Sequence, residues 1–312
     1  MTRGRPESNK HFLTDPRPAR YPPAPMFAGI LLGLGASACW ALANVAVARA
    51  GRDIGSFRAL LWSLLAGAVM AAVASAAIDQ HDLVLSSSRA GWIAVAAGSS
   101  LLAYVCMFYA FEHGRLSIAV PIMSSWAVIA AALSMVVFGE RLGSRQLAGG
   151  AAVVAGALVV SRYAQVESAR GGAGGTPRWV IGAVGAAIGF GVLIPTMARL
   201  VPMFGSIGSI GVVYVADIVL GVPLALAFGI GLRPPPGAAW LPVLAAAFFE
   251  TAGFACITLG ARFAPLALVS PFASLASALT VLYAWTVLRE RPARPVLIGA
   301  ALVCAGVVIL AL

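Results

Sequence analysis

Two acidic residues stand inside long apolar segments of the sequence. Glu250 lies near the middle of LPVLAAAFFETAGFACITLG, and Asp217 lies centrally in GVVYVADIVLGVPLAL. At the centre of a bilayer a carboxylate costs at least about 2.5–3.5 kcal/mol, so an acid at that depth predicts a function by default. A medium of low dielectric constant favours the neutral form of a carboxyl group, which allows proton exchange near neutral pH. We therefore predict Glu250 and Asp217 as groups that take up a proton or a cation.

Each acid also has a structural interpretation. Glu250 could remain protonated and bond to a neighbouring helix, and Asp217 could serve packing or a dimer contact. At an offset of 150 residues, the counterpart of Glu250 is Ser100, which shares a helical face with Tyr104, and the counterpart of Asp217 is Gly67.

Two prolines, Pro121 and Pro271, stand 150 positions apart in apolar segments. Proline removes a backbone donor and kinks a helix, and in a membrane the freed carbonyl group needs a partner from protein or cavity water. Breaks at corresponding positions of two repeats point to a substrate path. The alternative is that both prolines only shape the bundle.

Small polar and aromatic residues lie near these prolines and in the first apolar segment. Ser270, Ser274 and Ser277 share one helical face, and Trp40 and Asn44 are one turn apart. Serines also join helices, and tryptophans also anchor them at the membrane interface, so each has a structural alternative. The predicted cavity residues are Trp40, Asn44, Ser100, Tyr104, Pro121, Ser124, Ser125, Trp126, Glu250, Pro271, Ser274 and Ser277.

The elements that must position these residues are membrane helices. The chain of 312 residues is 61% hydrophobic and 10% charged, whereas a soluble domain has about 25% charged residues. Ten apolar spans follow one another, at about 27–48, 59–78, 91–111, 116–137, 145–161, 179–199, 208–230, 239–260, 264–287 and 295–312. A span of about 20 apolar residues crosses the hydrocarbon core as a helix.

A polar, Gly-rich stretch at 162–178 divides the spans into five and five. We predict a disordered cytoplasmic tail at 1–26, one five-helix repeat at 27–161, a linker at 162–178 and a second repeat at 179–312. The net charge of +10 is spread over loops and the tail, without a basic stripe that would indicate nucleic acid. The basic residues are balanced between the two sides of the membrane and do not set the orientation.

The two halves repeat each other without a gap. Residues 111–160 and 261–310 share 12 identities in 50, and FGERLGSRQLAGGAAVVAGALVV is matched by LRERPARPVLIGAALVCAGVVIL. Because each repeat holds an odd number of spans, the second copy is inverted in the membrane relative to the first. Inverted repeats around a site at the midplane are typical of secondary transporters.

Other classes lack their signatures. The three histidines lie outside the spans, and no metalloprotease, serine-hydrolase or phosphate-loop motif occurs. We therefore expect neither an enzyme nor a metal or organic cofactor. An intramembrane enzyme, a passive channel and a receptor remain the alternatives to a carrier.

The arrangement resembles the drug/metabolite transporter (DMT) superfamily, in its EamA-like family. The likeness is carried by Trp40 and Asn44, by the Gly-Glu-Arg-Leu element at 139–142 and by its second copy at 289–292, in which Arg289 and Pro292 depart from that pattern. The resemblance implies an all-α bundle of ten transmembrane helices in two inverted five-helix repeats, with both termini inside. It also implies a central cavity for small metabolites.

We expect a multi-pass protein of the bacterial inner (plasma) membrane that exports small metabolites, such as amino acids or related compounds, by alternating access. Its expected partners are a small-molecule substrate, the lipid bilayer and a coupled proton or cation, but no nucleic acid. Monomer and homodimer both stay open.

Overall fold

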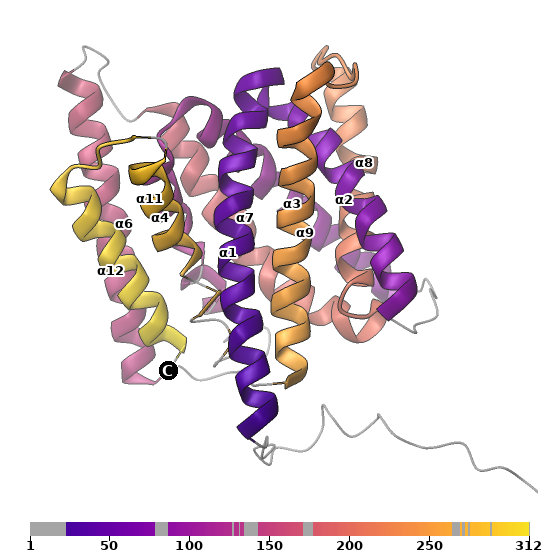
Figure 1. Ribbon diagram of the computed structural model, residues 1–312, viewed down its shortest axis with the longest axis horizontal. Helices are drawn as coiled ribbons and strands as arrows, with labels where there is room; N and C mark the ends of the chain where they lie inside the picture. The colour runs from indigo at the N-terminus through magenta and orange to yellow at the C-terminus, as the bar shows by residue number, and fades with distance from the viewer. Residues whose placement is uncertain are drawn as a thin grey trace, which may run out of the picture.

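The computed structural model describes residues 23–78, 87–126, 128–130, 132–133, 143–170, 177–263, 269, 272–273, 275–287 and 289–311. Every regular element in this part of the chain is a helix (Figure 1). The first half holds α1 (Pro23–Ile54), α2 (Ser56–Ile78), α3 (Ser87–His113), α4 (Leu116–Met123) and α6 (Ser144–Arg170). The second half holds α7 (Arg178–Phe204), α8 (Gly208–Ala227), the 3-10 helix η1 (Gly237–Ala239), α9 (Trp240–Phe263), α11 (Ala276–Thr286) and α12 (Arg294–Ala311).

Seven helices in the described ranges are long and apolar enough to cross a membrane, namely α1, α2, α3, α6, α7, α8 and α9. Their outer faces are apolar as well. On α2, for example, Leu65, Val69 and Val73 follow one another at helical spacing and are 43%, 58% and 69% exposed. Such a surface suits lipid rather than water. The total of ten spans stays a prediction, because residues 134–142 and 264–268 lie outside the described part.

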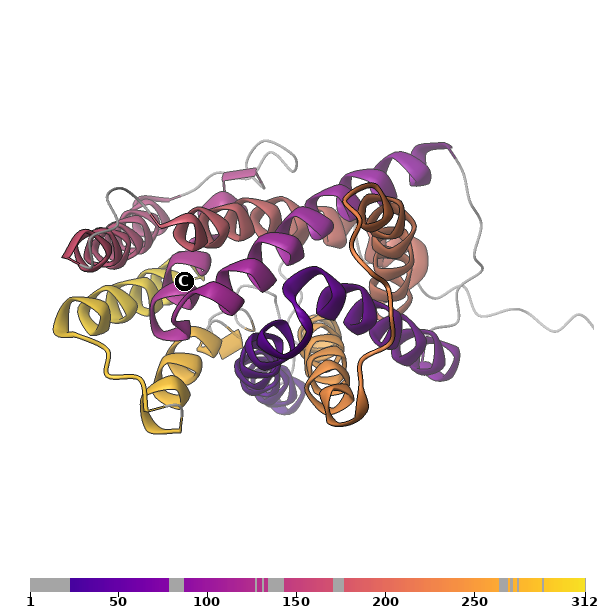
Figure 2. The same ribbon diagram turned by 90° about the horizontal axis from the view of Figure 1, so that it is seen from above.

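The helix neighbours reveal the relation between the two halves. α1 packs along α9, and α3 packs along α7, which are equivalent pairs if the first half is exchanged for the second. α2 packs against α8 at one edge of the bundle, and α6 against α12 at the opposite edge (Figure 1 and Figure 2). A two-fold axis between two copies produces this arrangement.

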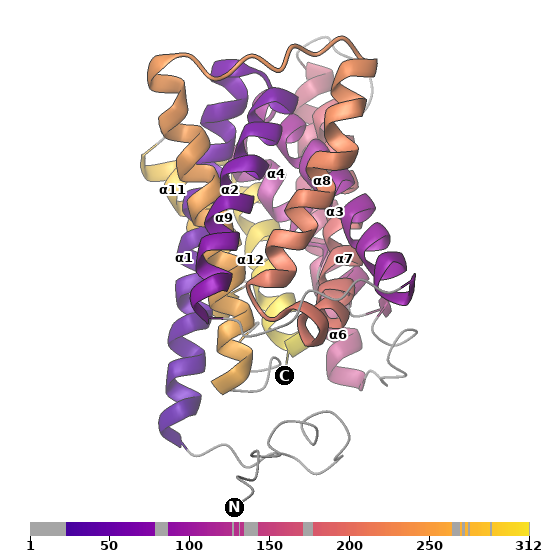
Figure 3. The same cartoon turned by 90° about the vertical axis from the view of Figure 1, so that its right-hand side faces the viewer.

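Two layers result, and each mixes helices of both halves. Seen from above, α1 and α9 lie in one layer with α11, and α3 and α7 lie in the other with α4 (Figure 2). The side view shows α1 and α9 running next to each other through the bundle (Figure 3).

Glycines explain why α6 and α12 carry similar sequences. A Cβ atom on Gly156 would lie 2.5 Å from the carbonyl oxygen of Gly299, and one on Gly306 would lie 2.6 Å from that of Gly149. The second contact is the first one shifted by 150 residues in both partners. Small residues let membrane helices approach closely, so the duplicated glycines build one symmetric helix pair.

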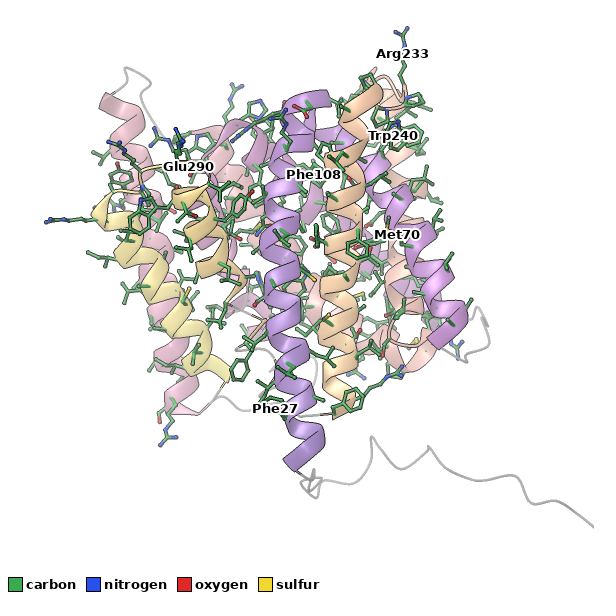
Figure 4. All side chains as sticks on the ribbon, viewed as in Figure 1. Phe27, Met70, Phe108, Arg233, Trp240 and Glu290 are labelled. Carbon is green, nitrogen blue, oxygen red and sulfur yellow. The ribbon has the colours of Figure 1, made fainter. Side chains whose placement is uncertain are left out.

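The ends of the bundle are named here by residues that Figure 4 labels. Arg233 and Trp240 mark the upper end, and Phe27 marks the lower end. α1 starts at the lower end, and α12 finishes toward that end as well (Figure 1 and Figure 3). The first and last described residues therefore lie toward the same end, as an even number of crossings requires.

Glu290 joins the two halves at the upper end. Its carboxylate accepts hydrogen bonds from the backbone N–H groups of Leu116 and Ser117, at 3.3 and 3.1 Å, and from the Ser117 hydroxyl at 2.6 Å. An anion suits the N-terminus of a helix, where N–H groups lack partners. The equivalent residue of the first half, Glu140, and its neighbour Arg141 lie outside the described residues. α6 continues as a helix to Arg170, so the polar stretch expected as a linker from residue 162 begins inside a helix.

Candidate functional site: a cavity between the two layers

A central cavity separates the two helix layers. The space between atoms there is about 700 Å³, part of which is open to the surroundings, and about 80 Å³ of it can hold the centre of a water molecule. Each water needs roughly 10–15 Å³ of such central space. The inner part thus has room for several waters or for one compact solute.

Both layers contribute to the lining. From the first layer come Trp40 and Asn44 of α1, Glu250 and Phe254 of α9, and Ser277 of α11. From the second layer come Met107 of α3, Met123 of α4, Phe190 and Ile194 of α7, and the following pair Ser124 and Trp126 just after α4. Among the described lining residues, Glu250 is the one with an ionisable carboxyl group.

Glu250 is held from across the layers. The hydroxyl group of Tyr104, on α3, donates a hydrogen bond of 3.3 Å to its Oε1 atom. Tyr104 itself is only 3% exposed. The carboxyl group therefore has one side toward a buried donor and the other toward the cavity.

Asn44 ties α1 to α11. Its side-chain amide donates to the Thr280 hydroxyl at 3.1 Å, and that hydroxyl donates to the carbonyl of Ala276 at 2.7 Å. Asn44 is 7% exposed and Thr280 is fully buried. The bond fixes α1, which forms one wall of the cavity, to α11.

Trp40 packs against α9 at Gly253, where the helix has no side chain. A Cβ atom on Gly253 would come within 2.5 Å of the indole Nε1 atom, so only glycine admits the ring here. Gly253 follows Glu250 by one helical turn. The buried Nε1–H group finds no hydrogen-bond partner among the described residues, and it is therefore a donor that a solute could use.

The aromatic side chains form two related pairs. Trp40 and Phe254 meet edge to face with ring centroids 5.4 Å apart, and Phe190 and Tyr104 do the same at 5.4 Å. An offset of 150 converts Trp40 into Phe190 and Tyr104 into Phe254. The two pairs are thus the same contact in the two halves, and they flank the middle of the bundle.

The predicted site residues fall into three groups. Six line the central cavity: Trp40, Asn44, Ser124, Trp126, Glu250 and Ser277. Four are described but do not line it: Ser100, Tyr104, Pro121 and Ser125. Two, Pro271 and Ser274, lie outside the described residues, as does Ser270.

The four that do not line it have other surroundings. Pro121 is buried in α4, which ends two residues later at Met123, and Ser125 donates to the carbonyl of Ile122 at 2.8 Å. Ser100 is fully buried and donates a bond of 2.6 Å to Oδ2 of Asp217, on α8. Asp217 is itself 0% exposed. The second acid therefore lies away from the central cavity, against α3.

Sequence reasoning missed Phe190, Phe254 and Thr280. The first two could have been found, because they are the counterparts of Trp40 and Tyr104 in the repeat. Thr280 had no such signal, since its role depends on the rotation of α11 toward Asn44.

Comparisons with known proteins agree with this architecture. The EamA family, described as the EamA-like transporter family, matches residues 27–162 and again residues 177–312. A solved structure described as "Crystal structure of protein" is similar with a TM-score of 0.65 and 19% identity, over 91% of this chain and 96% of that one. That likeness concerns the fold alone. No curated protein matches the chain. The two matches together span most of the sequence, so the chain is a multi-pass membrane protein that belongs to the EamA-like transporter family.

Proposed function

We propose that this protein is a secondary carrier of the bacterial inner membrane that exports small metabolites, such as amino acids or related compounds, by alternating access. The central cavity supports the proposal most directly, because it lies between two layers that the inverted repeat relates to each other. Two related layers can rock against each other and open the same site to either side.

The lining favours a compact, partly apolar solute with an amino group. Aromatic rings from both halves surround a single described carboxyl group, and cations are attracted both to carboxylates and to aromatic faces. The unpartnered Trp40 Nε1–H group adds a donor for an oxygen atom of the solute. Such a mixture of apolar walls and few polar groups is typical of small-molecule sites.

Glu250 is the proposed coupling group. Its carboxyl group faces the solute site, so a proton or a cationic solute can compete for the same negative charge. Competition of this kind links movement of the solute to movement of the proton, since the group cannot hold both at once.

The test is counterflow in proteoliposomes loaded with a pool of amino acids and small metabolites, with and without a pH gradient. Wild type is compared with Glu250→Gln and with Asp53→Asn, an acid outside the cavity that pairs with Arg49 at 3.0 Å. We expect saturable exchange of one or more solutes in wild type and Asp53→Asn, and loss of the gradient dependence in Glu250→Gln.

Other outcomes separate the alternatives. Gradient dependence that persists in Glu250→Gln would exclude Glu250 as the coupling group. Flux without saturation or counterflow would indicate a channel, chemical change of the solute would indicate an intramembrane enzyme, and the absence of any exchange by folded protein would favour a receptor.

A further inference from the structure

Two smaller cavities flank the central one and are related by the repeat. The larger side cavity, in which about 20 Å³ can hold the centre of a water molecule, lies among α1, α2, α3, α8 and α9. The smaller one, with about 10 Å³ of such space, lies among α3, α7, α8 and α9. Six of the eight residues that line the smaller one have their counterpart, 150 positions away, in the lining of the larger one. Three of these pairs are Ser100 with Glu250, Met197 with Val47, and Ile210 with Leu60.

The side cavities extend toward opposite ends of the bundle. Leu60 lies in the first turns of α2, which begins at the upper end, and Ile210 lies in the first turn of α8, which begins at the lower end (Figure 1). The larger side cavity thus points to the upper end and the smaller one to the lower end, as the inversion of the repeat demands.

Each side cavity has one carboxyl group beside it. Glu250 lines the larger cavity directly. In the smaller cavity the same position is Ser100, whose hydroxyl donates to Asp217 behind it. The counterpart of Asp217 is Gly67, which packs against Thr251 next to Glu250. The contact between α2 and α9 and the equivalent contact between α8 and α3 therefore hold one acid each. The acid is Glu250, on α9, in the first contact and Asp217, on α8, in the second.

Asp217 is incompletely satisfied in this conformation. Its Oδ2 atom has the Ser100 bond, but its Oδ1 atom is buried and has no partner among the described residues. A buried polar atom without a partner requires an explanation, and one explanation is a second conformation in which water reaches it.

The inverted repeat defines that second conformation. If the two halves exchange their conformations, the smaller side cavity takes the size of the larger one, and the larger one narrows. Ser100 then takes the surroundings that Glu250 has now, and Asp217, which is bonded to Ser100, takes those of Gly67.

We propose that Asp217 is a second proton-exchanging group of the carrier, which water reaches in the opposite-facing conformation, while Glu250 serves the conformation seen here. The inference rests on the proposed alternating access. The exchange moves only a proton between the carboxyl group and water, and no other bond is made or broken. The titratable groups that face the two acids in the described structure are Tyr104 of α3, Tyr214 of α8 and Cys39 of α1.

The test measures hydrogen–deuterium exchange of the two carboxyl groups by infrared difference spectroscopy, at a pH low enough to protonate both. Asp217→Asn and Glu250→Gln assign the two C=O bands. One sample is locked with the upper end closed, by joining Ser117→Cys to Glu290→Cys with a short bifunctional thiol reagent. In this background Cys39, Cys106, Cys256 and Cys304 are replaced by alanine.

We expect Glu250 to exchange in locked and unlocked protein alike. Asp217 should exchange in unlocked protein and at least about tenfold more slowly after locking. Unlocked protein visits the opposite-facing conformation as a minor state, typically populated at roughly 0.1–10%, and the lock removes that state. Equal exchange of Asp217 in both samples, or none in either, would overturn the inference.

Counterflow on the same preparations keeps this inference separate from the proposed function. Active exchange of a solute by protein whose Asp217 never exchanges would overturn the role of Asp217 and leave the carrier intact. No counterflow of any solute would overturn the carrier, and with it the basis of the inference. Ser100→Ala, which keeps the carboxyl group but removes its hydrogen bond, should raise the exchange rate of Asp217 in unlocked protein.

Discussion

At the scale of single residues, the cavity depends on a few side chains that the opposite layer or the adjacent helix holds in place. Tyr104 donates to Glu250 from the opposite layer, Gly253 makes room for Trp40, and Thr280 accepts a hydrogen bond from the amide of Asn44. Each of these contacts joins two helices. A substitution in the supporting residue should therefore change the site without touching the groups that face the solute.

Gly253→Ala should distort the site by displacing Trp40. The added methyl group would lie 2.5 Å from the indole nitrogen, and overpacking of a fitted interior typically costs about 1–3 kcal/mol. We expect a lower midpoint of thermal unfolding, measured by tryptophan fluorescence. We also expect a higher KM for the counterflow solute, measured by transport. Gly98→Ala is the matched control, because nothing lies within 4 Å of its added Cβ atom, and it should leave KM unchanged. An unaltered KM in Gly253→Ala would contradict the placement of Trp40.

The bond between Asn44 and Thr280 should be measurable by a double-mutant cycle. Interhelical hydrogen bonds in membranes contribute about 0.6–2 kcal/mol, and the cycle isolates that part. Asn44→Ala and Thr280→Val should each destabilise the protein, and the double variant should lose less than the sum. Strict additivity of the two changes in unfolding free energy would show that the bond contributes nothing.

At the scale of elements, helix ends and helix contacts connect the two halves. α4 belongs to the first half, yet Glu290 of the second half supplies the acceptor for its first N–H groups. The bond ties the two halves together at the upper end. Under the proposed alternating access it has to break when that end opens, and Glu290 would then take part in the movement as well as in the fold.

Glu290→Gln should weaken the closed upper end. Hydrogen bonds to a charged partner contribute about 1.5–3 kcal/mol to stability. Because Glu290 is partly exposed, we expect the loss of stability to lie at or below the lower end of that range. The change should raise the accessibility of a cysteine introduced at Val120, measured by its rate of labelling with a charged thiol reagent. Arg291→Gln, at an exposed neighbouring position, is the control. The same labelling rate in Glu290→Gln and wild type would show that the bond does not close this end.

The close approach of α6 and α12 at their glycines leads to a second prediction at this scale. Gly156→Leu and Gly306→Leu should both destabilise the protein by more than about 1–3 kcal/mol, because the atoms nearest to each added Cβ belong to the backbone of the partner helix and cannot move aside. Ala155→Leu and Ala305→Leu, adjacent positions that face outward, should be nearly neutral. Thermal unfolding of the four variants in nanodiscs would decide, and similar midpoints for all four would contradict the close approach of the two helices.

Much of the architecture could be predicted from the sequence, because lipid imposes a strong pattern. Long apolar runs and the offset of 150 indicated the helices and their relation, and α2, α7 and α8 begin and end within a few residues of the expected spans. The structure adds the glycine and aromatic pairs that this offset relates. The family match over both halves supports the same duplication.

The facing of individual side chains could not be predicted as well. Ser100 was expected in the central cavity because its counterpart is Glu250, but the repeat places the two at equivalent positions in different side cavities. Which neighbour a helix presents to Asp217 depends on the rotation and packing of α3 and α8. Apolar sequences on all sides of a membrane helix contain little information on that rotation.

At the scale of the whole molecule, the central claim is that the two layers rock so that one end opens as the other closes. Spin labels at His113 and Leu241 report the upper distance between α3 and α9, and labels at Ala90 and Phe263 report the lower distance between the same helices. All four positions are exposed. Pulsed electron paramagnetic resonance in nanodiscs, with and without the solute that counterflow identifies, gives both distances. We predict shifts of opposite sign at the two ends, as a rigid-body movement of one layer against the other requires. Shifts of the same sign, or none at either end while counterflow proceeds, would contradict alternating access by rocking layers.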